Sequence, residues 1–256
     1  MLNQKKGLAF ISGASSGIGR STAITLAQQG YDLLLMARRE NKLNDLKLEI
    51  SQLNASVTIN THVGDVQCKE DIQSLCKTFD NELKTLSVLI NNAGLAKGTE
   101  PFHSCDPQDW DTMIDTNIKG LLYLTRSLLP KMLTNNFGHV INLGSVAGRW
   151  VYPGGSVYCA TKFAVRAITE GLRQDLCGTN IRITNIEPGM VETEFSLVRL
   201  GTQEEANAVY AGMTPLKAED IAETISWCLS RPPHVNIQEL VLYPTAQAAI
   251  RQVHRT

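Results

Sequence analysis

Short apolar runs alternate along this chain with longer stretches in which apolar residues recur every three or four positions. The short runs are typical of buried strands, and the longer spacing is typical of amphipathic helices. The runs predict strands at Gly7–Ile11, Asp32–Met36, Val57–His62, Leu86–Asn91, His139–Leu143, Arg182–Ile186 and Glu239–Leu242. The longer stretches predict helices at Gly17–Gln29, Glu40–Asn54, Lys69–Asn81, Pro107–Leu133, Ser156–Cys177 and Ala218–Ser230. Such alternation builds βαβ units, so we expect a single α/β domain over residues 1–256, with a doubly wound seven-stranded parallel sheet and helices on both faces.

One connection is longer than the others. Residues 190–213 lie between the sixth predicted strand and the last predicted helix, where connections are usually short. Long connections in compact domains often carry function. We therefore expect residues 190–213 to form a lid over a substrate site.

The composition excludes several classes of protein. Hydrophobic residues make up 43% of the chain and charged residues 19%, which is typical of a globular domain. The formal net charge is −1, so neither a nucleic-acid nor a membrane partner is indicated. The six cysteines include no Cys-x-x-Cys pair and the histidines do not cluster with them, so no metal site is predicted. The first apolar run, Leu8–Ile11, is too short for a signal peptide, and we expect a cytoplasmic protein.

A glycine-rich turn follows the first predicted strand and begins the first predicted helix. Its sequence over residues 12–19 is Ser-Gly-Ala-Ser-Ser-Gly-Ile-Gly. Glycine permits a tight turn and a close approach of the backbone to a pyrophosphate at the helix N-terminus. A strand before this motif and a helix after it are the context of a dinucleotide site in a Rossmann fold. We therefore expect cofactor contacts from Gly13, Ser15, Ser16, Gly17, Ile18 and Gly19.

The end of the second predicted strand indicates which dinucleotide binds. A site for NAD usually has an acidic residue at this point, which binds the ribose 2′-hydroxyl. This chain has Arg38 and Arg39 instead. Guanidinium groups bind phosphate through paired N–H donors, so two arginines favour a cofactor with a 2′-phosphate. The sequence predicts NADP(H).

Ser145, Tyr158 and Lys162 have the residue types and the spacing of an acid–base site. Tyr158 and Lys162 are four positions apart and would share one face of a helix. Because a nearby ammonium favours the phenolate, Lys162 is expected to lower the pKa of Tyr158 toward neutrality. Ser145 is expected to donate a hydrogen bond to a substrate carbonyl oxygen and polarise it.

With these motifs the chain resembles the short-chain dehydrogenase/reductase family over nearly its full length. The resemblance is carried by Gly13, Gly17, Gly19, Asp65, Val66, Asn91, Asn92, Ala93, Gly94, Asn117, Ser145, Tyr158, Lys162, Pro188 and Gly189. It implies that Asp65 hydrogen-bonds the adenine and that Asn117 bends a long helix and holds a water beside Lys162. It also implies assembly as a homotetramer. The further cofactor contacts that it implies come from Val66, Asn92, Tyr158, Lys162, Pro188, Gly189, Val191 and Thr193.

Within that family the chain is most similar to the NADP-dependent 3-hydroxy acid (serine) dehydrogenases, a group that also reduces malonic semialdehyde. The similar stretches are residues 94–101, 109–120, 186–191, 193–199 and 233–237. The resemblance implies that a hydride passes from NADPH to the substrate carbonyl while Ser145 holds the oxyanion and Tyr158 protonates it. Lys162 would also grip the nicotinamide ribose. For a substrate with a carboxylate, we expect Arg199 in the lid to supply the cation.

Two features depart from that subgroup. The segment between Gly189 and Thr193 is one residue shorter, which bears on how the lid closes. Arg149 stands where a small residue is expected, and we expect it to alter the mouth of the pocket.

Two other functions stay open at this point. The first is a carbonyl reductase for a neutral ketone, diketone, sugar or β-keto-acyl substrate. The second is a non-catalytic NADP-binding sensor, which the presence of Ser145, Tyr158 and Lys162 disfavours.

Overall fold

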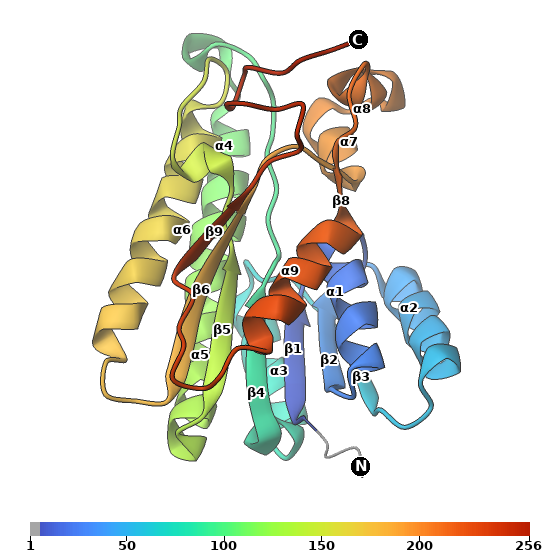
Figure 1. Cartoon of the computed structure of the whole chain (residues 1–256), viewed down its shortest axis with the longest axis vertical. Coiled ribbons are helices and arrows are strands. Elements are labelled where there is room, and N and C mark those ends of the chain that lie inside the picture. The colour runs from blue at the N-terminus through green and yellow to red at the C-terminus, as the bar shows by residue number, and fades with distance from the viewer. Residues whose placement is uncertain (1–5) are drawn as a thin grey trace.

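Parallel strands form the centre of the molecule, whose computed structural model describes residues 6–256 (Figure 1). The first five residues of the predicted domain lie outside the described part. The sheet consists of β1 (Leu8–Ser12), β2 (Asp32–Ala37), β3 (Ile59–Val63), β4 (Leu86–Asn91), β5 (Gly138–Leu143), β6 (Ile181–Pro188) and β9 (Glu239–Leu242). Its strand order is β3-β2-β1-β4-β5-β6-β9, and all neighbours are parallel. The predicted seven-stranded parallel sheet is confirmed.

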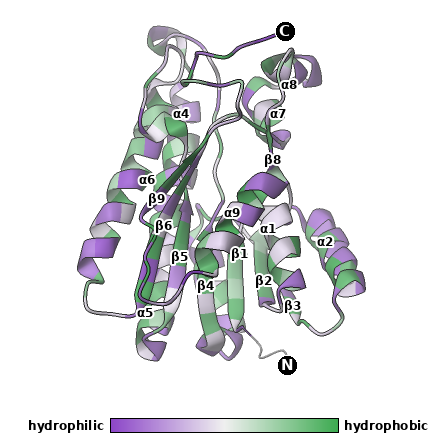
Figure 2. Cartoon of the chain, in the orientation of Figure 1, coloured by the Kyte–Doolittle hydropathy of each residue, from purple (hydrophilic) through white to green (hydrophobic). Residues whose placement is uncertain are grey.

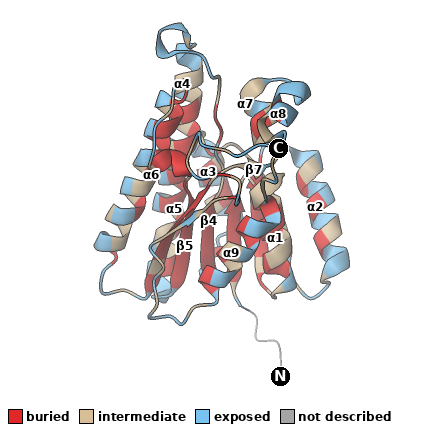
Figure 3. Ribbon diagram, turned by 45° about the horizontal axis from the view of Figure 1, so that its top comes forward, coloured by how far each residue is buried: buried red, intermediate tan, exposed pale blue. Residues whose placement is uncertain are grey.

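Helices cover both faces of this sheet. One face is packed against α1 (Gly17–Gln28), α2 (Glu40–Leu53) and α9 (Ala218–Leu229). The other is packed against α3 (Lys69–Thr78), α5 (Leu121–Asn135) and α6 (Ser156–Asp175). The strands are largely hydrophobic, whereas the helices mix hydrophobic and hydrophilic residues (Figure 2). Burial follows the same division, with the central strands buried and the outer helix faces exposed (Figure 3). The doubly wound fold class is therefore confirmed.

The position of β1 determines where a ligand can bind. β1 lies between β2 and β4, so the strand order reverses direction at this point. In open sheets of this kind, ligands bind beyond the carboxyl ends of the strands at the reversal. The glycine turn follows β1 directly, and Asn92 follows β4 directly.

The predicted helix Pro107–Leu133 is interrupted. Between α4 (Pro107–Ile114) and α5 lies a π-helical turn over Asp115–Gly120, which contains Asn117. The Asn117 side chain accepts a hydrogen bond from Leu95 N (2.9 Å) and donates to Leu95 O (2.8 Å). These bonds draw the turn toward the segment that follows β4. A π-helical turn is a common cause of a bend in a helix, so the bend expected at Asn117 stays a prediction to which this turn gives a physical cause.

The long connection contains elements that the sequence did not predict. Its two helices are α7 (Glu194–Leu200) and α8 (Gln203–Tyr210), and β7 (Val191–Glu192) pairs with β8 (Leu216–Lys217). The C-terminal segment, residues 243–256, folds back beside α8, where Arg255 Nη2 donates to Val209 O (2.9 Å). In the part of the chain from residue 6 onward, no helix has the length and apolar character needed to cross a membrane.

Candidate active site

A cavity of about 1000 Å³ lies at the carboxyl ends of the strands. It extends from Arg38 and Asp65, past the glycine turn, to Tyr158 and the lid. Almost all the predicted site residues line it: Gly13, Ser15, Ser16, Gly17, Ile18, Arg38, Arg39, Asp65, Val66, Asn92, Ser145, Tyr158, Lys162, Pro188, Gly189, Val191, Thr193 and Arg199. Gly19 and Asn117 do not line the cavity. Gly19 packs on Gly13, and Asn117 hydrogen-bonds Leu95; both of these neighbours line it.

The glycine turn has the geometry of an anion cradle. Gly13 and Gly17 have φ values of +64° and +52°, a backbone conformation that residues with a Cβ rarely adopt. A Cβ on Gly13 would lie 2.9 Å from the Cα of Ala93, so the turn packs directly on the segment after β4. A Cβ on Gly19 would collide with the carbonyl oxygen of Gly13. Because α1 begins at Gly17, its free backbone N–H groups are available to a pyrophosphate at this end of the cavity.

The two arginines after β2 differ in their surroundings. Arg38 is 63% exposed, and its Nη1 lies 3.6 Å from Asp65 Oδ2. Arg39 donates to Ser16 Oγ (2.7 Å), to Ser15 Oγ (3.1 Å) and to Glu194 Oε2 (2.7 Å). Both line the cavity at the end where a 2′-phosphate is predicted.

Tyr158 and Lys162 lie on one face of α6 and are buried. Ser145 begins the short 3-10 turn Val146–Gly148, where its Oγ accepts a hydrogen bond from Ala147 N (3.1 Å). Lys162 Nζ donates to the Leu143 carbonyl oxygen (2.7 Å) and lies 6.0 Å from the centre of the Tyr158 ring. A lysine ammonium has three N–H groups, so Lys162 retains donors for a ligand in the cavity.

The charge state of this pair differs from the sequence-based expectation. Burial raises the pKa of Tyr158 above its ordinary value, and the neighbouring Tyr152 raises it further, against a lowering by the hydrogen bond with Ser145. Burial also lowers the pKa of Lys162 to about 8. The prediction that Lys162 brings the Tyr158 pKa down is therefore wrong for the cofactor-free protein, because the cost of burying a phenolate dominates. The Tyr158 phenol is therefore neutral at neutral pH in the cofactor-free protein.

Space beside Lys162 is kept open by Gly94. A Cβ at this position would lie 3.3 Å from Asn117 Oδ1 and 3.5 Å from Lys162 Nζ. Asn117 Nδ2 also donates to Thr161 Oγ1 (3.0 Å), which fixes the π-helical turn against α6. Asn117 is thus a positioning residue in this structure, and its water beside Lys162 stays a prediction.

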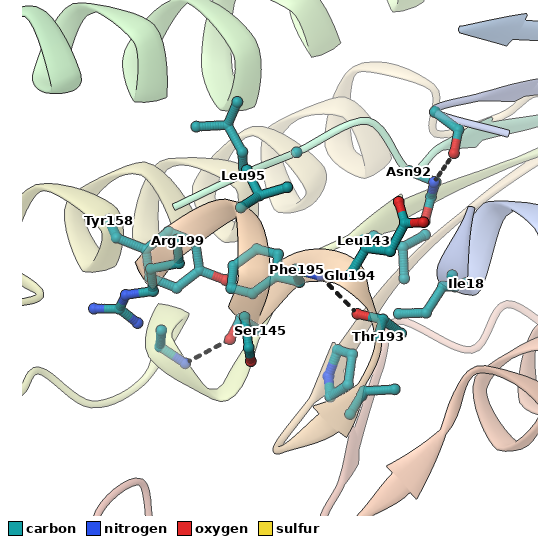
Figure 4. A pocket seen from close by; sticks show the side chains of 18 of the residues that line it. Ile18, Asn92, Leu95, Leu143, Ser145, Tyr158, Thr193, Glu194, Phe195 and Arg199 are labelled. Carbon is teal, nitrogen blue, oxygen red and sulfur yellow. Dashed lines mark hydrogen bonds between the residues drawn. The ribbon is translucent and has the colours of Figure 1, made fainter. Parts of the chain in front are cut away.

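The substrate end of the cavity brings together Ser145, Tyr158, Phe195 and Arg199 (Figure 4). The Phe195 ring is centred 5.8 Å from the Tyr158 ring. Arg199 donates to the Tyr152 hydroxyl (2.8 Å) and to the Gly98 carbonyl oxygen (3.1 Å). Its guanidinium carbon lies 5.8 Å from the centre of the Tyr158 ring. The cation expected in the lid therefore lies next to the predicted acid–base residue.

Several residues of this end were missed by the sequence analysis. Tyr152, Phe195 and Gln247 line the cavity, and Gln247 Oε1 accepts a hydrogen bond from Met190 N (2.9 Å). Gln247 thereby supports the segment that begins at Pro188. Phe195 was within reach of a sequence argument, since it follows Thr193 and Glu194 in the lid. Gln247 had no local signal, because only the return of the C-terminal segment brings it here.

The prediction that Arg149 alters the pocket mouth is wrong. Arg149 is absent from the cavity wall and instead forms ion pairs with Glu187 and Glu239. Glu187 is fully buried, and a buried carboxylate requires a paired charge. Arg166 completes the cluster by binding Glu239 (2.9 Å).

Among residues 6–256, no group of three or more His, Cys, Asp or Glu side chains could hold a metal ion.

Comparison with known proteins agrees with this geometry. The sequence model of the short chain dehydrogenase family matches residues 7–202. The chain belongs to this family. It is 45% identical to sulfoacetaldehyde reductase 2 of Chromohalobacter salexigens, over 94% of this chain and 95% of that protein. It is 42% identical to an NADP-dependent 3-hydroxy acid dehydrogenase of Escherichia coli, over 97% of this chain and 99% of that protein.

A solved structure of a related enzyme has a similar fold. The closed form of serine dehydrogenase complexed with NADP⁺ matches with a TM-score of 0.89 and 41% identity, over 97% of this chain and 100% of that one. The predicted family, fold class and reaction class are confirmed: the protein is a short-chain oxidoreductase. The predicted cofactor, NADP(H), is the one that the names of these relatives give.

Proposed function

We propose that this protein is an NADP(H)-dependent oxidoreductase that interconverts a small hydroxy compound bearing an anionic group with its aldehyde or ketone. The observation that carries this proposal is the position of Arg199, whose guanidinium lies beside Tyr158 in the same cavity. An anionic head group at Arg199 would direct the carbon next to it toward the Tyr158 hydroxyl and Ser145. Such a substrate matches the 3-hydroxy acids and the sulfonated aldehyde in the names of the relatives.

The residues present fit the cofactor. The α1 N-terminus and the glycine turn suit the pyrophosphate, and Arg38 suits the 2′-phosphate. Lys162 is placed to bind the nicotinamide ribose, in the space that Gly94 keeps open. Pro188, Gly189, Val191 and Thr193 would flank the nicotinamide, and Asp65, Val66 and Asn92 would line the rest of the path. When bound, the nicotinamide supplies or accepts the hydride.

The protein residues manage the proton and the oxygen. In reduction, Ser145 donates a hydrogen bond to the carbonyl oxygen and Tyr158 donates its proton to the oxygen as negative charge develops there. The raised pKa of Tyr158 keeps this proton in place at neutral pH. Oxidation requires Tyr158 to accept a proton, so it is favoured by alkaline conditions. The Lys162 ammonium stabilises the phenolate that forms in the reduction.

The choice of anionic group separates two versions of the proposal. Serine and 3-hydroxypropionate carry a carboxylate, whereas the product of sulfoacetaldehyde reduction carries a sulfonate. The Arg199 guanidinium can donate to either group, so its position alone supports both. A neutral ketone or sugar remains a second candidate, which would leave the Arg199 cation without a role in binding.

The test is a substrate panel with purified protein. Oxidation of L-serine, 3-hydroxyisobutyrate and 3-hydroxypropionate would be followed with NADP⁺ and with NAD⁺, and reduction of sulfoacetaldehyde and of the neutral aldehyde butanal with NADPH. We expect turnover of at least one anionic substrate with the phosphorylated cofactor, and its loss in Tyr158→Phe. Turnover confined to neutral carbonyl compounds would refute the anionic assignment while retaining the reaction class.

We also propose a cytoplasmic homotetramer with residues 190–213 as the substrate lid. Exposed apolar side chains such as Leu122 on α5 and Phe163 on α6 support burial of these helices against other copies. Light scattering would show four chain masses if the assembly is a tetramer. One or two chain masses would refute it.

A further inference from the structure

Arg38 and Arg39 are adjacent in the chain, yet only Arg38 has most of its N–H donors free for a ligand, whereas Arg39 has one Nη1 N–H left. Arg39 uses Nε and Nη2 on the Ser15 and Ser16 hydroxyls and Nη1 on Glu194. Arg38 makes one loose contact, 3.6 Å from Asp65, and is 63% exposed. A phosphate that binds Arg39 through paired N–H donors would have to displace the hydroxyl or carboxylate partners that Arg39 already has. A phosphate that binds Arg38 would displace almost nothing.

The partner of Arg39 is the first residue of the first lid helix. Glu194 begins α7 and receives hydrogen bonds from two cations of the β2–α2 region, Arg39 Nη1 (2.7 Å) and Lys42 Nζ (2.5 Å). The hydrogen bond from Lys42, followed by that from Arg39, lowers the pKa of Glu194 to about 2. The carboxylate is therefore charged near neutral pH and can accept from both cations.

Arg39 also connects the lid to the glycine turn. Arg39 binds Ser15 and Ser16 of that turn while it binds Glu194 of the lid. Thr193, directly before Glu194, packs so closely that a Cβ on Gly17 would lie 3.2 Å from its side chain. Arg39 and Glu194 both line the cavity. Any widening of the cavity between the lid and the glycine turn must break this cluster.

We propose that the two arginines have separate tasks: Arg38 binds the cofactor 2′-phosphate, while Arg39 and Lys42 bind Glu194 and latch the lid over the cofactor. The proposal rests on the proposed cofactor for its first half only, because the latch is formed by residues of the chain alone. Loss of the latch affects cofactors with and without a 2′-phosphate alike. Loss of Arg38 affects only the phosphorylated one.

The expected sizes of the two effects differ. A charge-assisted bond from Arg38 to a phosphate predicts a loss of roughly 10- to 100-fold in NADP⁺ affinity on Arg38→Ala, with NAD⁺ affinity unchanged. The ion pairs of Glu194 are partly exposed, and such pairs contribute little each. For Glu194→Gln we therefore expect only about three- to tenfold weaker binding of both cofactors, mainly through faster release.

The experiment combines calorimetric titration with hydrogen exchange. NADP⁺ and NAD⁺ would be titrated into the wild type, Arg38→Ala, Arg39→Ala and Glu194→Gln. Glu204→Gln is the matched control, since it removes the same charge from the lid at the start of α8, away from Arg39. Exchange of the backbone amides of residues 190–200 would be measured in the cofactor-free proteins.

The two halves of the proposal can fail separately from each other and from the proposed cofactor. Faster exchange at residues 190–200 in Glu194→Gln and Arg39→Ala, but not in Glu204→Gln, supports the latch without any cofactor. Unchanged exchange overturns it. A selective loss of NADP⁺ binding in Arg39→Ala, or tighter NADP⁺ binding alone in Glu194→Gln, would show that the phosphate and Glu194 compete for Arg39 and would overturn the division of tasks. Failure of the wild type to bind NADP⁺ would refute the cofactor and the Arg38 half, but would leave the exchange result standing.

Discussion

The two ends of the cavity are built in different ways. At the cofactor end, functional residues directly follow strands: the glycine turn follows β1, Arg38 follows β2 and Asn92 follows β4. At the substrate end, Arg199 comes from a lid helix, while Tyr152 and Gln247 come from loops far from it in the chain. The sheet fixes the first end, whereas contacts between distant segments hold the second.

The two ends are expected to differ in how well they tolerate substitutions. At the cofactor end, a new side chain would contact backbone atoms that the sheet holds in place, as at Gly19 and Gly13. At the substrate end, a new side chain would contact side chains that are positioned by other side chains, as Arg199 is positioned by its hydrogen bond to Tyr152. We expect the cofactor end to govern stability and dinucleotide binding, and the substrate end to govern which carbonyl compound reacts.

The largest expected effect comes from Tyr158, the predicted acid–base residue, which lies between the two ends. Removal of its hydroxyl in Tyr158→Phe takes away the proton donor, and we expect kcat to fall about 100- to 10,000-fold. NADP⁺ affinity should stay within about twofold, because the ring and Lys162 remain. Steady-state kinetics and cofactor titration measure both quantities. Tyr152→Phe is the control; it loses the bond from Arg199 and should change KM more than kcat. A Tyr158→Phe protein with near-normal kcat would show that another group donates the proton.

The next effect concerns the buried ammonium of Lys162. Its pKa is lowered to about 8 in the folded protein, below the value of about 10.4 in an unfolded chain. Below pH about 8, Lys162 is charged in both states, and burial of the charge lowers the free energy of unfolding by its full amount. Between pH about 8 and about 10.4 the unfolded chain binds more protons than the folded one, so the free energy of unfolding rises and this cost disappears. We expect Lys162→Met to be more stable than the wild type by about 1–3 kcal/mol near pH 7, with a smaller difference near pH 10. Urea unfolding at both pH values tests this, and a difference that does not change with pH contradicts it.

A third effect tests the substrate end alone. Arg199→Met removes the cation but keeps an unbranched apolar side chain in place of the arginine stem, and we expect kcat/KM for anionic substrates to fall about 10- to 100-fold. A neutral aldehyde should lose less than about threefold. Parallel kinetics with the two substrates separate charge recognition from damage to the lid. Equal losses on both would mean that Arg199 supports the structure and does not read the substrate.

A fourth comparison, which includes the smallest expected effect, concerns two glycines in helices. A Cβ on Gly19 would meet the Gly13 carbonyl oxygen, whereas a Cβ on Gly171 in α6 meets no atom within 4 Å. We expect Gly19→Ala to lower the free energy of unfolding by about 1–3 kcal/mol and to weaken cofactor binding. Gly171→Ala should raise the free energy of unfolding by about 0.5–1 kcal/mol, because alanine favours a helix. Thermal or urea unfolding of both variants measures the contrast. If both variants lose stability equally, the close approach at Gly19 is not the cause.

The contrast between the two ends also explains which features the sequence could predict. The strands, the glycine turn and the residues after each strand follow from local pattern, since the carboxyl ends of parallel strands meet at one edge. The partners of Arg39 could not be read from the chain, because Glu194 lies 155 positions away. Gln247 was missed for the same reason. The errors on Arg149 and on the Tyr158 pKa came from burial: a buried Glu187 attracts Arg149, and a buried phenol resists ionisation.

We propose above all that Arg199 holds the anionic group of a carbonyl substrate while Tyr158 protonates its oxygen in an NADPH-dependent reduction. The most direct test is the ratio of kcat/KM for malonic semialdehyde to that for butanal, a neutral aldehyde of similar size, with NADPH in the wild type. A ratio of at least about ten is predicted from one charge-assisted contact. A ratio near or below one would contradict the claim and place the natural substrate among neutral carbonyl compounds.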